Sequence, residues 1–318
     1  MPDYLKGYRQ TQEDLFAAEI HKIYTDAAGE ARDKIRDFLA RHKKKAAILQ
    51  KQVDEGKMTA AAYKAWLRGQ VFQGRQWRHR LKDITEVYTK ADTKARAMLN
   101  RTRIDIFSEA ANYTAYSIAR DLRGSVTFNL YDTRTVSALL RDKPKVLPEW
   151  KIDEPKDYRW NERRVQTALV KGIAEGASIP DIGRKLTEDL ATDNAVKMNM
   201  FARTSMTAAQ NAGRMERLRE TEDMGIDVRK QWLAAHDSRT RDTHAALDGQ
   251  TRRIDEPFQI DGMKIDYPGD PLAPPELVYN CRCTMIYVYP GLKPSHTAHK
   301  FESYAEWKER TGGGKNGK

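Results

Sequence analysis

Apolar residues recur at helical spacing through the first third of the chain, where no proline occurs between residues 11 and 123. Thr11 followed by Asp14 is typical of a helix start. The residues of the first apolar stripe are Phe16, Ile20, Ile23 and Ala27, and after Gly29 it resumes at Ile35, Phe38 and Leu49. The run Asp-Glu-Gly-Lys at 54–57 is a turn signal. This pattern predicts helical structure that ends near residue 54.

A second helix is predicted from Thr59 to the neighbourhood of Gly124. Its apolar positions step by four and three residues alternately: Trp77, Leu81, Ile84, Tyr88, Ala91, Ala95 and Met98. Such a heptad-like repeat indicates long antiparallel helices that pack with coiled-coil geometry. The stripe lacks convergent polar groups, so it indicates a core seam and not a cofactor site.

Residues 143–160 contain three prolines and are predicted to include a linker at 146–160, after an elongated helical region over 1–145. Three further helices are expected. The first carries Val165, Leu169 and Ile173, the second is capped by Ser178 and carries Ile182, Leu186 and Leu190, and the third carries Met198, Ala202, Ser205, Ala209 and Ala212. The small residues of the third helix predict tight packing.

After Gly225 the apolar period changes from about 3.6 residues to 2, which indicates strands. We expect strands over 228–233 and 284–289, and a hairpin over 258–265 that turns at Asp261-Gly262. The predicted fold is therefore mostly α, with a small α+β domain over 161–292 that sets an antiparallel sheet behind a helical layer. Residues 293–318 carry no core pattern and are predicted to be a flexible tail.

The composition narrows the class of protein. The 318 residues are 40% hydrophobic and 32% charged, as in helix-rich proteins that fold in water. No run approaches the roughly 18 apolar residues of a membrane span, and the first residues lack the apolar region of an export signal. The two cysteines exclude a disulfide scaffold and suit a reducing compartment.

The net charge of +11 is concentrated in one region. Residues 31–103 hold 20 basic and 7 acidic side chains, a net charge of +13. A local excess of this kind is typical of a surface that meets a polyanion, although counter-charges on a partner protein would explain it equally well. The predicted contacts to duplex DNA, independent of base sequence, are Arg41, Lys43, Lys44, Lys45, Arg75, Arg78 and Arg80.

Two polar clusters could carry chemistry: residues 236–249 and residues 279–283. In an extended segment Cys281 and Cys283 point to one face and could bind zinc with His244 as a third ligand. Strong zinc signals use two Cys-x-x-Cys pairs, so we expect buried thiols, a hydrogen-bonded histidine and no bound metal or other cofactor.

An enzyme hypothesis also uses these clusters. His236 or His244 would act with an aspartate in general acid/base chemistry while an arginine holds a phosphate. The aspartates are Asp237, Asp242 and Asp248, and the arginines are Arg239, Arg241 and Arg282. Because such residues in turn-rich segments more often satisfy backbone groups, we expect no catalytic residues. The run Gly312-Gly313-Gly314-Lys315 lacks the spacing and flanking elements of a phosphate loop.

An ordered set of short motifs resembles a known family. The motifs are Ala202-Arg203-Thr204, Asn211 with Gly213, Trp232, His-Asp-x-Arg-Thr-Arg-x-x-His-x-x-Leu-Asp-Gly at 236–249, Pro268-Gly269-Asp270-Pro271 and Asn280-Cys281-Arg282-Cys283. Together they resemble the C-terminal domain of phage head morphogenesis proteins, the minor capsid family named for the F protein of phage Mu. The resemblance covers roughly residues 160–290.

The resemblance implies a structural protein present in few copies inside the phage head, after assembly in the host cytoplasm. It implies association with the portal vertex, with the major capsid protein or scaffold and with packaged DNA, and a role in head assembly, DNA packaging or delivery. Some relatives carry a fuller Cys and His set, of which His244, Cys281 and Cys283 remain here. The alternatives are a nucleic-acid-processing enzyme that uses residues 236–248 and a cellular DNA-binding protein.

Overall fold

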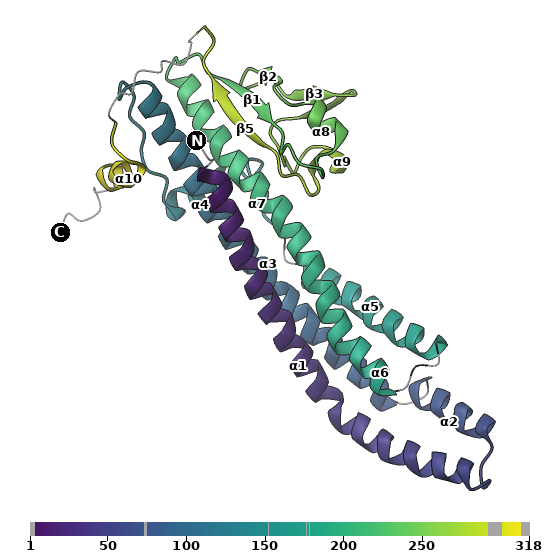
Figure 1. Ribbon diagram of the computed structural model, residues 1–318. Helices are drawn as coiled ribbons and strands as arrows, with labels where there is room; N and C mark the ends of the chain where they lie inside the picture. Colours follow the sequence, from purple (N-terminus) through teal and green to yellow (C-terminus); the bar gives the residue numbers. More distant parts are fainter. Residues whose placement is uncertain are drawn as a thin grey trace, which may run out of the picture. The chain divides into compact units, whose positions relative to one another are not determined.

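The computed structural model describes residues 4–72, 75–151, 153–175, 177, 179–291 and 301–312 (Figure 1). The helices are α1 (Tyr4–Asp54), α2 (Ala60–Phe72), α3 (Arg75–Asp121), α4 (Thr133–Asp142), α5 (Glu154–Ala174), α6 (Ile179–Arg184), the π-helix η1 (Lys185–Asp189), α7 (Leu190–Asp223), α8 (Asp242–Ala246), α9 (Pro275–Val278) and α10 (Tyr304–Gly312). The strands are β1 (Arg229–Leu233), β2 (Thr251–Arg252), β3 (Phe258–Ile260), β4 (Met263–Ile265) and β5 (Thr284–Val288).

The chain forms two compact units, each made of several segments. Unit 1 consists of Met1–Phe16, Leu99–Trp150 and Met200–Lys318, and unit 2 consists of Ala17–Met98 and Lys151–Asn199. The long helices α1, α3 and α7 therefore each contribute residues to both units. The predicted domains, 1–145, 161–292 and a tail, are continuous in the sequence. The two units are not, because each long helix has residues in both.

Unit 2 is a bundle of helices whose core uses the predicted seam. The seam residues Ile84, Tyr88, Ala91 and Ala95 of α3 are buried, as are Ile20, Tyr24 and Ile35 of α1. The helix α1 runs through Gly29 without a break. The helix expected from Thr59 corresponds to α2 and α3, and residues 73–74 lie outside the described residues. The side chain of Trp77 lies outside the described residues.

The predicted linker 146–160 is largely ordered by packing. Helix α5 begins at Glu154, where Pro155 is compatible with a first helical turn. The carboxylate of Asp157 is buried and pairs with Arg96 at 2.6 Å within unit 2. The boundary between the two units falls at Trp150, inside this segment. The predicted helix cap Ser178 lies outside the described residues.

Unit 1 places small strands beside the C-terminal half of α7 (Figure 1). The strands form a three-stranded antiparallel sheet in the order β2-β1-β5 and a separate hairpin of β3 and β4. The prediction of one sheet is thus corrected to two, since β3 and β4 pair only with each other. The hairpin turns as predicted, with positive φ at Asp261 and Gly262.

The predicted flexible tail contains an ordered helix, α10. Its Trp307 is only 2% exposed and packs edge-on against Tyr116 in unit 1. The hydroxyl of Tyr116 donates to the carbonyl of Glu302 at 2.9 Å. The rings of Phe301 and Tyr304 also contact Tyr116. Aromatic contacts at three positions therefore hold a segment whose sequence lacks a repeating core pattern. Residues 292–300 and 313–318 lie outside the described residues.

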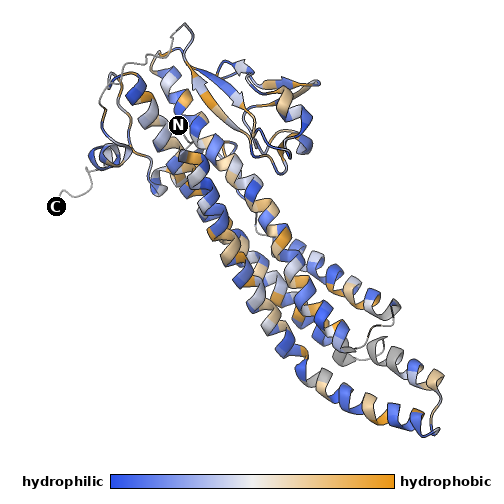
Figure 2. Cartoon of the chain, viewed as in Figure 1, coloured by the Kyte–Doolittle hydropathy of each residue, from blue (hydrophilic) through white to orange (hydrophobic). Residues whose placement is uncertain are grey.

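The observed fold confirms the predicted class, which is mostly helical with small antiparallel sheets near the C-terminus. Hydrophilic and hydrophobic residues are interspersed along the long helices (Figure 2). In the described part of the chain, no helix combines the length and apolar content that a membrane crossing requires.

Candidate functional site

The two polar clusters singled out in the sequence meet in unit 1, around a small core. His244 lies on α8, and Cys281 and Cys283 lie directly before β5. All three are buried, and the ligand-type atoms of their side chains lie within 4.8 Å of one another. The ring of Trp232 on β1 meets the His244 ring edge-on at 5.6 Å. The structure therefore brings together the three residues that the sequence proposed as a group.

Hydrogen bonds determine which nitrogen of His244 carries its proton. A guanidinium nitrogen of Arg241 lies 3.1 Å from His244 Nε2. Because a guanidinium only donates, Nε2 accepts and the neutral ring carries its proton on Nδ1. That Nδ1 lies 3.4 Å from Sγ of Cys283 and 3.6 Å from Sγ of Cys281. The imidazole thus donates toward the two sulfur atoms.

The two thiols differ in acidity because they face each other. A hydrogen bond from Cys281 lowers the pKa of Cys283 below the usual range of a thiol, and the bond from His244 lowers it further. The same contact raises the pKa of Cys281, and burial adds to the rise. When one of the two thiols is ionised, these contacts favour the negative charge on Cys283.

These donors fit a soft or borderline cation only in part. Two sulfurs and one imidazole are the right chemistry for zinc. In the described part of the chain, the group of possible ligands consists of His244, Cys281 and Cys283. The guanidinium of Arg241 contacts the imidazole of His244. If zinc were bound, these residues would hold it and it would supply a Lewis acid with an open position. The expectation of no bound metal stays a prediction.

The other candidate acid/base residues support the backbone. His236 Nε2 lies 3.3 Å from a carboxylate oxygen of Asp248, whose second oxygen accepts from the amide of Ala234 at 2.8 Å. Asp237 accepts from the amide of Arg239 and is held at both oxygens by Arg282. The hydrogen bond from Arg282 lowers the pKa of Asp237. Asp237 and Asp248 therefore each have a structural partner, whereas Asp242 is exposed in the first turn of α8.

Helix α7 anchors this loop region through Thr204, a residue of the recognised motifs, and through Thr207. The hydroxyl of Thr207 donates to the carbonyl of Cys281 at 2.9 Å, and the amide of Asn280 donates to the hydroxyl of Thr204 at 3.0 Å. Asn280 adopts positive φ, a conformation that asparagine tolerates well. These two residues of α7 thus fix the Asn-Cys-Arg-Cys segment in place.

Asn211 links three segments from the interior of α7. Its amide donates to the carbonyl of Pro268 at 2.9 Å, and its oxygen accepts from the hydroxyl of Thr284 at 3.0 Å. Next to it, a Cβ on Gly269 would lie 3.0 Å from the backbone nitrogen of Ala208, which explains the glycine. The sequence identifies Asn211, Pro268 and Gly269 only as members of motifs, because the residues that they contact are far apart in the chain.

The predicted DNA contacts lie on two helices and differ in exposure. Arg41 and Lys43 to Lys45 of α1 are exposed and form no ion pair with any residue whose side chain is described. Arg80 of α3 is half-buried and pairs with Asp83 at 3.4 Å. Arg75 and Arg78 lie on α3, but their side chains are outside the described set. The exposed basic face, defined here as Arg41 and Lys43 to Lys45, is therefore the part able to meet a polyanion.

Comparisons with known proteins point to one family. Residues 163–286 match the family model described as "Phage Mu protein F like protein". The chain is 29% identical over 161 residues to "Minor head protein GP7" of Bacillus phage SPP1, across 46% of this chain and 50% of that protein. It is 33% identical over 161 residues to "NAD(+)--arginine ADP-ribosyltransferase EFV" of Enterococcus faecalis, across 47% of this chain and 32% of that protein.

Each match covers only part of the relative's length. The chain spans about half of the phage relative and about a third of the bacterial one. No solved structure matches the chain significantly. The family match covers most of α5 and the region from α6 to β5, which includes His244, both cysteines and their anchors on α7.

Proposed function

We propose that the chain, whose residues 163–286 match the family model described as "Phage Mu protein F like protein", is a non-enzymatic minor head protein that associates with the portal vertex and with packaged DNA. The observation that carries the proposal is the family match together with the similarity to a phage minor head protein. In this role the protein assists head assembly, DNA packaging or delivery, and it contacts the portal and the major capsid protein or scaffold.

A structural role agrees with the use of the polar residues. The carboxylates of Asp237 and Asp248 are committed to Arg282, His236 and backbone amides. The activity in the name of the bacterial relative belongs to that protein, of which this chain spans 32%.

Association with DNA agrees with the exposed basic face. Its four cations are consecutive or nearly so on α1, and residues 31–103 carry a net charge of +13. Phosphate contacts made by such a face are independent of base sequence and depend strongly on salt. Inside a filled head the local phosphate concentration is very high, so weak contacts suffice.

Purified virions and the cognate portal test this proposal. We expect the full chain to be present in DNA-filled heads, and to be retained when it is co-expressed with the portal and the portal is captured. Incubation with NAD⁺ or with nucleic acid should give no turnover. The proposal fails if the chain is abundant in the infected cell but absent from purified virions and from captured portal.

A further inference from the structure

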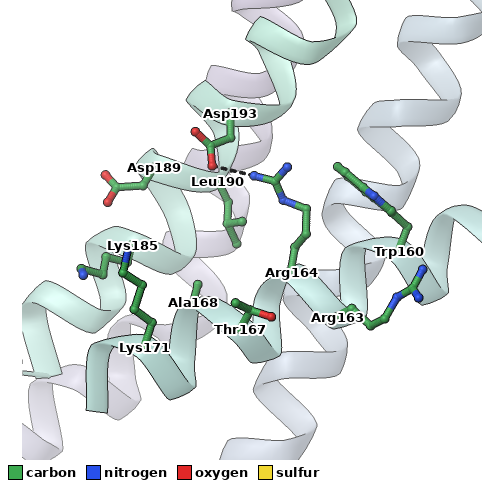
Figure 3. A pocket seen from close by; sticks show the side chains of 10 residues that line it. All are labelled: Trp160, Arg163, Arg164, Thr167, Ala168, Lys171, Lys185, Asp189, Leu190 and Asp193. Carbon is green, nitrogen blue, oxygen red and sulfur yellow. Dashed lines mark hydrogen bonds and ion pairs between the residues drawn. The ribbon is translucent and has the colours of Figure 1, made fainter. Parts of the chain in front are cut away.

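Unit 2 contains a cavity of about 580 Å³ that the role described above does not use (Figure 3). Its walls are α5, η1 and the first turn of α7, so it lies wholly within one compact unit. Arg163, Thr167 and Lys171 line it at successive spacings of four residues, which places them on one face of α5. Each of the three side chains ends in a hydrogen-bond donor.

Cationic side chains outnumber acidic ones in the lining of the cavity. Four cationic and two acidic side chains line the cavity, and both acidic ones already have partners. Asp193 accepts from Arg164 at 2.6 Å and Asp189 accepts from Arg184 at 3.0 Å. Arg163 is exposed and forms no ion pair with any residue that the structure describes. Lys171 and Lys185 pair with Glu175 at 3.9 and 2.5 Å. Among the described residues, Arg163 is therefore the lining cation whose charge remains without a counter-ion.

One further cation, Lys197, lies beside Trp160 at the edge of the cavity, on the same ring as Arg164. Nζ of Lys197 lies 3.6 Å from the centre of a Trp160 ring, and the guanidinium carbon of Arg164 lies 4.8 Å from it. Burial lowers the pKa of Lys197, and the charge of Arg164 lowers it further. The tryptophan thus holds two like charges close together, an arrangement that a bound anion would stabilise.

We propose that this cavity binds a phosphate group, with Arg163 as its charged contact and Thr167, one helical turn further along α5, as a neutral donor. Arginine offers a planar fork of donors that matches phosphate oxygens. The row of donors along one helix face suits the phosphate of a nucleic-acid strand as well as free phosphate. The proposal does not depend on the role in the phage head.

Calorimetric titration of the full chain with inorganic phosphate, at constant ionic strength, tests the site. We expect Arg163→Gln to weaken phosphate binding about tenfold, because it removes a charge-assisted hydrogen bond. The variant should keep the wild-type thermal unfolding curve, since Arg163 is exposed. The matched control is Lys156→Gln, which removes one exposed charge from the same helix outside the lining and should bind phosphate as the wild type does.

A second titration, with a labelled DNA duplex, distinguishes a site for the phosphates of nucleic acid from a site for free phosphate. If the site serves nucleic acid, Arg163→Gln weakens duplex binding by a similar factor; if it serves free phosphate, duplex binding is unchanged while phosphate binding is lost. The proposal is overturned if the wild type binds no phosphate, if Arg163→Gln binds as well as the wild type, or if Lys156→Gln loses as much. Each of these results leaves the portal and virion tests unaffected.

Discussion

Gly213 on α7 faces the carbonyl oxygen of Phe107 on α3 so closely that a Cβ atom there would lie 2.4 Å from that oxygen. Real Cβ atoms do not approach an oxygen to this distance, so the two backbones are in contact because residue 213 has no side chain. The neighbouring Ala209 and Ala212 are fully buried. The small-residue stripe predicted from the sequence therefore packs α7 tightly against α3 within unit 1.

Gly213→Ala should destabilise the protein by about 1 to 3 kcal/mol, because the helices must separate or bend to admit the methyl group. Urea unfolding followed by circular dichroism measures the change. Gly7→Ala is the control, since Gly7 lies in a helix of the same unit with nothing within 4 Å of its added Cβ. Alanine there should be neutral or stabilising by about 0.5 kcal/mol. Equal effects of the two substitutions would contradict the close contact.

Lys230 on β1 is fully buried and should make stability depend on alkaline pH. Its Nζ donates to the carbonyl of Asp266 at 2.9 Å, and burial lowers its pKa from 10.5 to about 8. Between these values the unfolded chain holds a proton that the folded chain has lost, so stability rises with pH. One proton gives a slope of up to about 1.4 kcal/mol per pH unit.

Denaturation curves of the wild type and Lys230→Met between pH 8 and 9.5 test this effect. The difference in unfolding free energy between the two should change with pH in the predicted direction, since the variant lacks the titrating group. Lys264→Met, at an exposed position of β4, should keep the wild-type dependence. A constant difference between wild type and Lys230→Met across the range would refute the lowered pKa.

The sequence predicted those parts of the fold whose signals are local. Asp261-Gly262 determines the hairpin by its backbone preferences, and the heptad spacing of Ile84, Tyr88 and Ala91 determines a buried helix face. Helix α10 gave no such signal, because Trp307 is buried by rings from distant parts of the chain. The two compact units were likewise not predictable, since helical periodicity does not tell which residues of a long helix share a core.

The candidate site was predicted in its residues but not in its connections. Cys281 and Cys283 lie close together just before β5, and the side chain of His244 lies beside them, as the sequence analysis considered for a metal site. The contact of Arg241 with the imidazole and the bonds from Thr204 and Thr207 to the cysteine loop depend on tertiary packing. Periodicity contains no information on such contacts, so the roles of these residues could not be predicted from the sequence.

Cys281→Ser together with Cys283→Ser should cost about 1 to 3 kcal/mol in stability through lost packing, with no metal-dependent component. The reason is that the pair is buried and already satisfied by His244, which donates from Nδ1. Denaturation with and without a chelator should give the same free energy for the wild type. Elemental analysis of protein purified without chelator should find no stoichiometric zinc. About one zinc per chain, lost in His244→Ala, would reverse this prediction.

Charge reversal on the exposed basic face should weaken DNA binding for all sequences alike. Lys43→Glu, Lys44→Glu and Lys45→Glu together replace three cations on α1 that form no ion pair with residues of described side chain. Each phosphate neutralised contributes a slope of about −0.9 to the logarithm of the binding constant against the logarithm of salt concentration. We therefore expect the triple variant to bind duplex DNA more weakly and with a shallower salt slope.

Fluorescence anisotropy with two duplexes of unrelated sequence, over a series of salt concentrations, measures both quantities. Lys22→Glu is the control, because it reverses one exposed charge on the same helix away from the basic face. It should shift affinity slightly and leave most of the slope, whereas the triple variant should lose up to three units of charge-dependent slope. If the triple variant binds DNA as tightly as the wild type, the exposed basic face contacts an acidic protein instead of DNA. Capture of the portal or capsid protein by the wild type but not by the variant would then identify that partner.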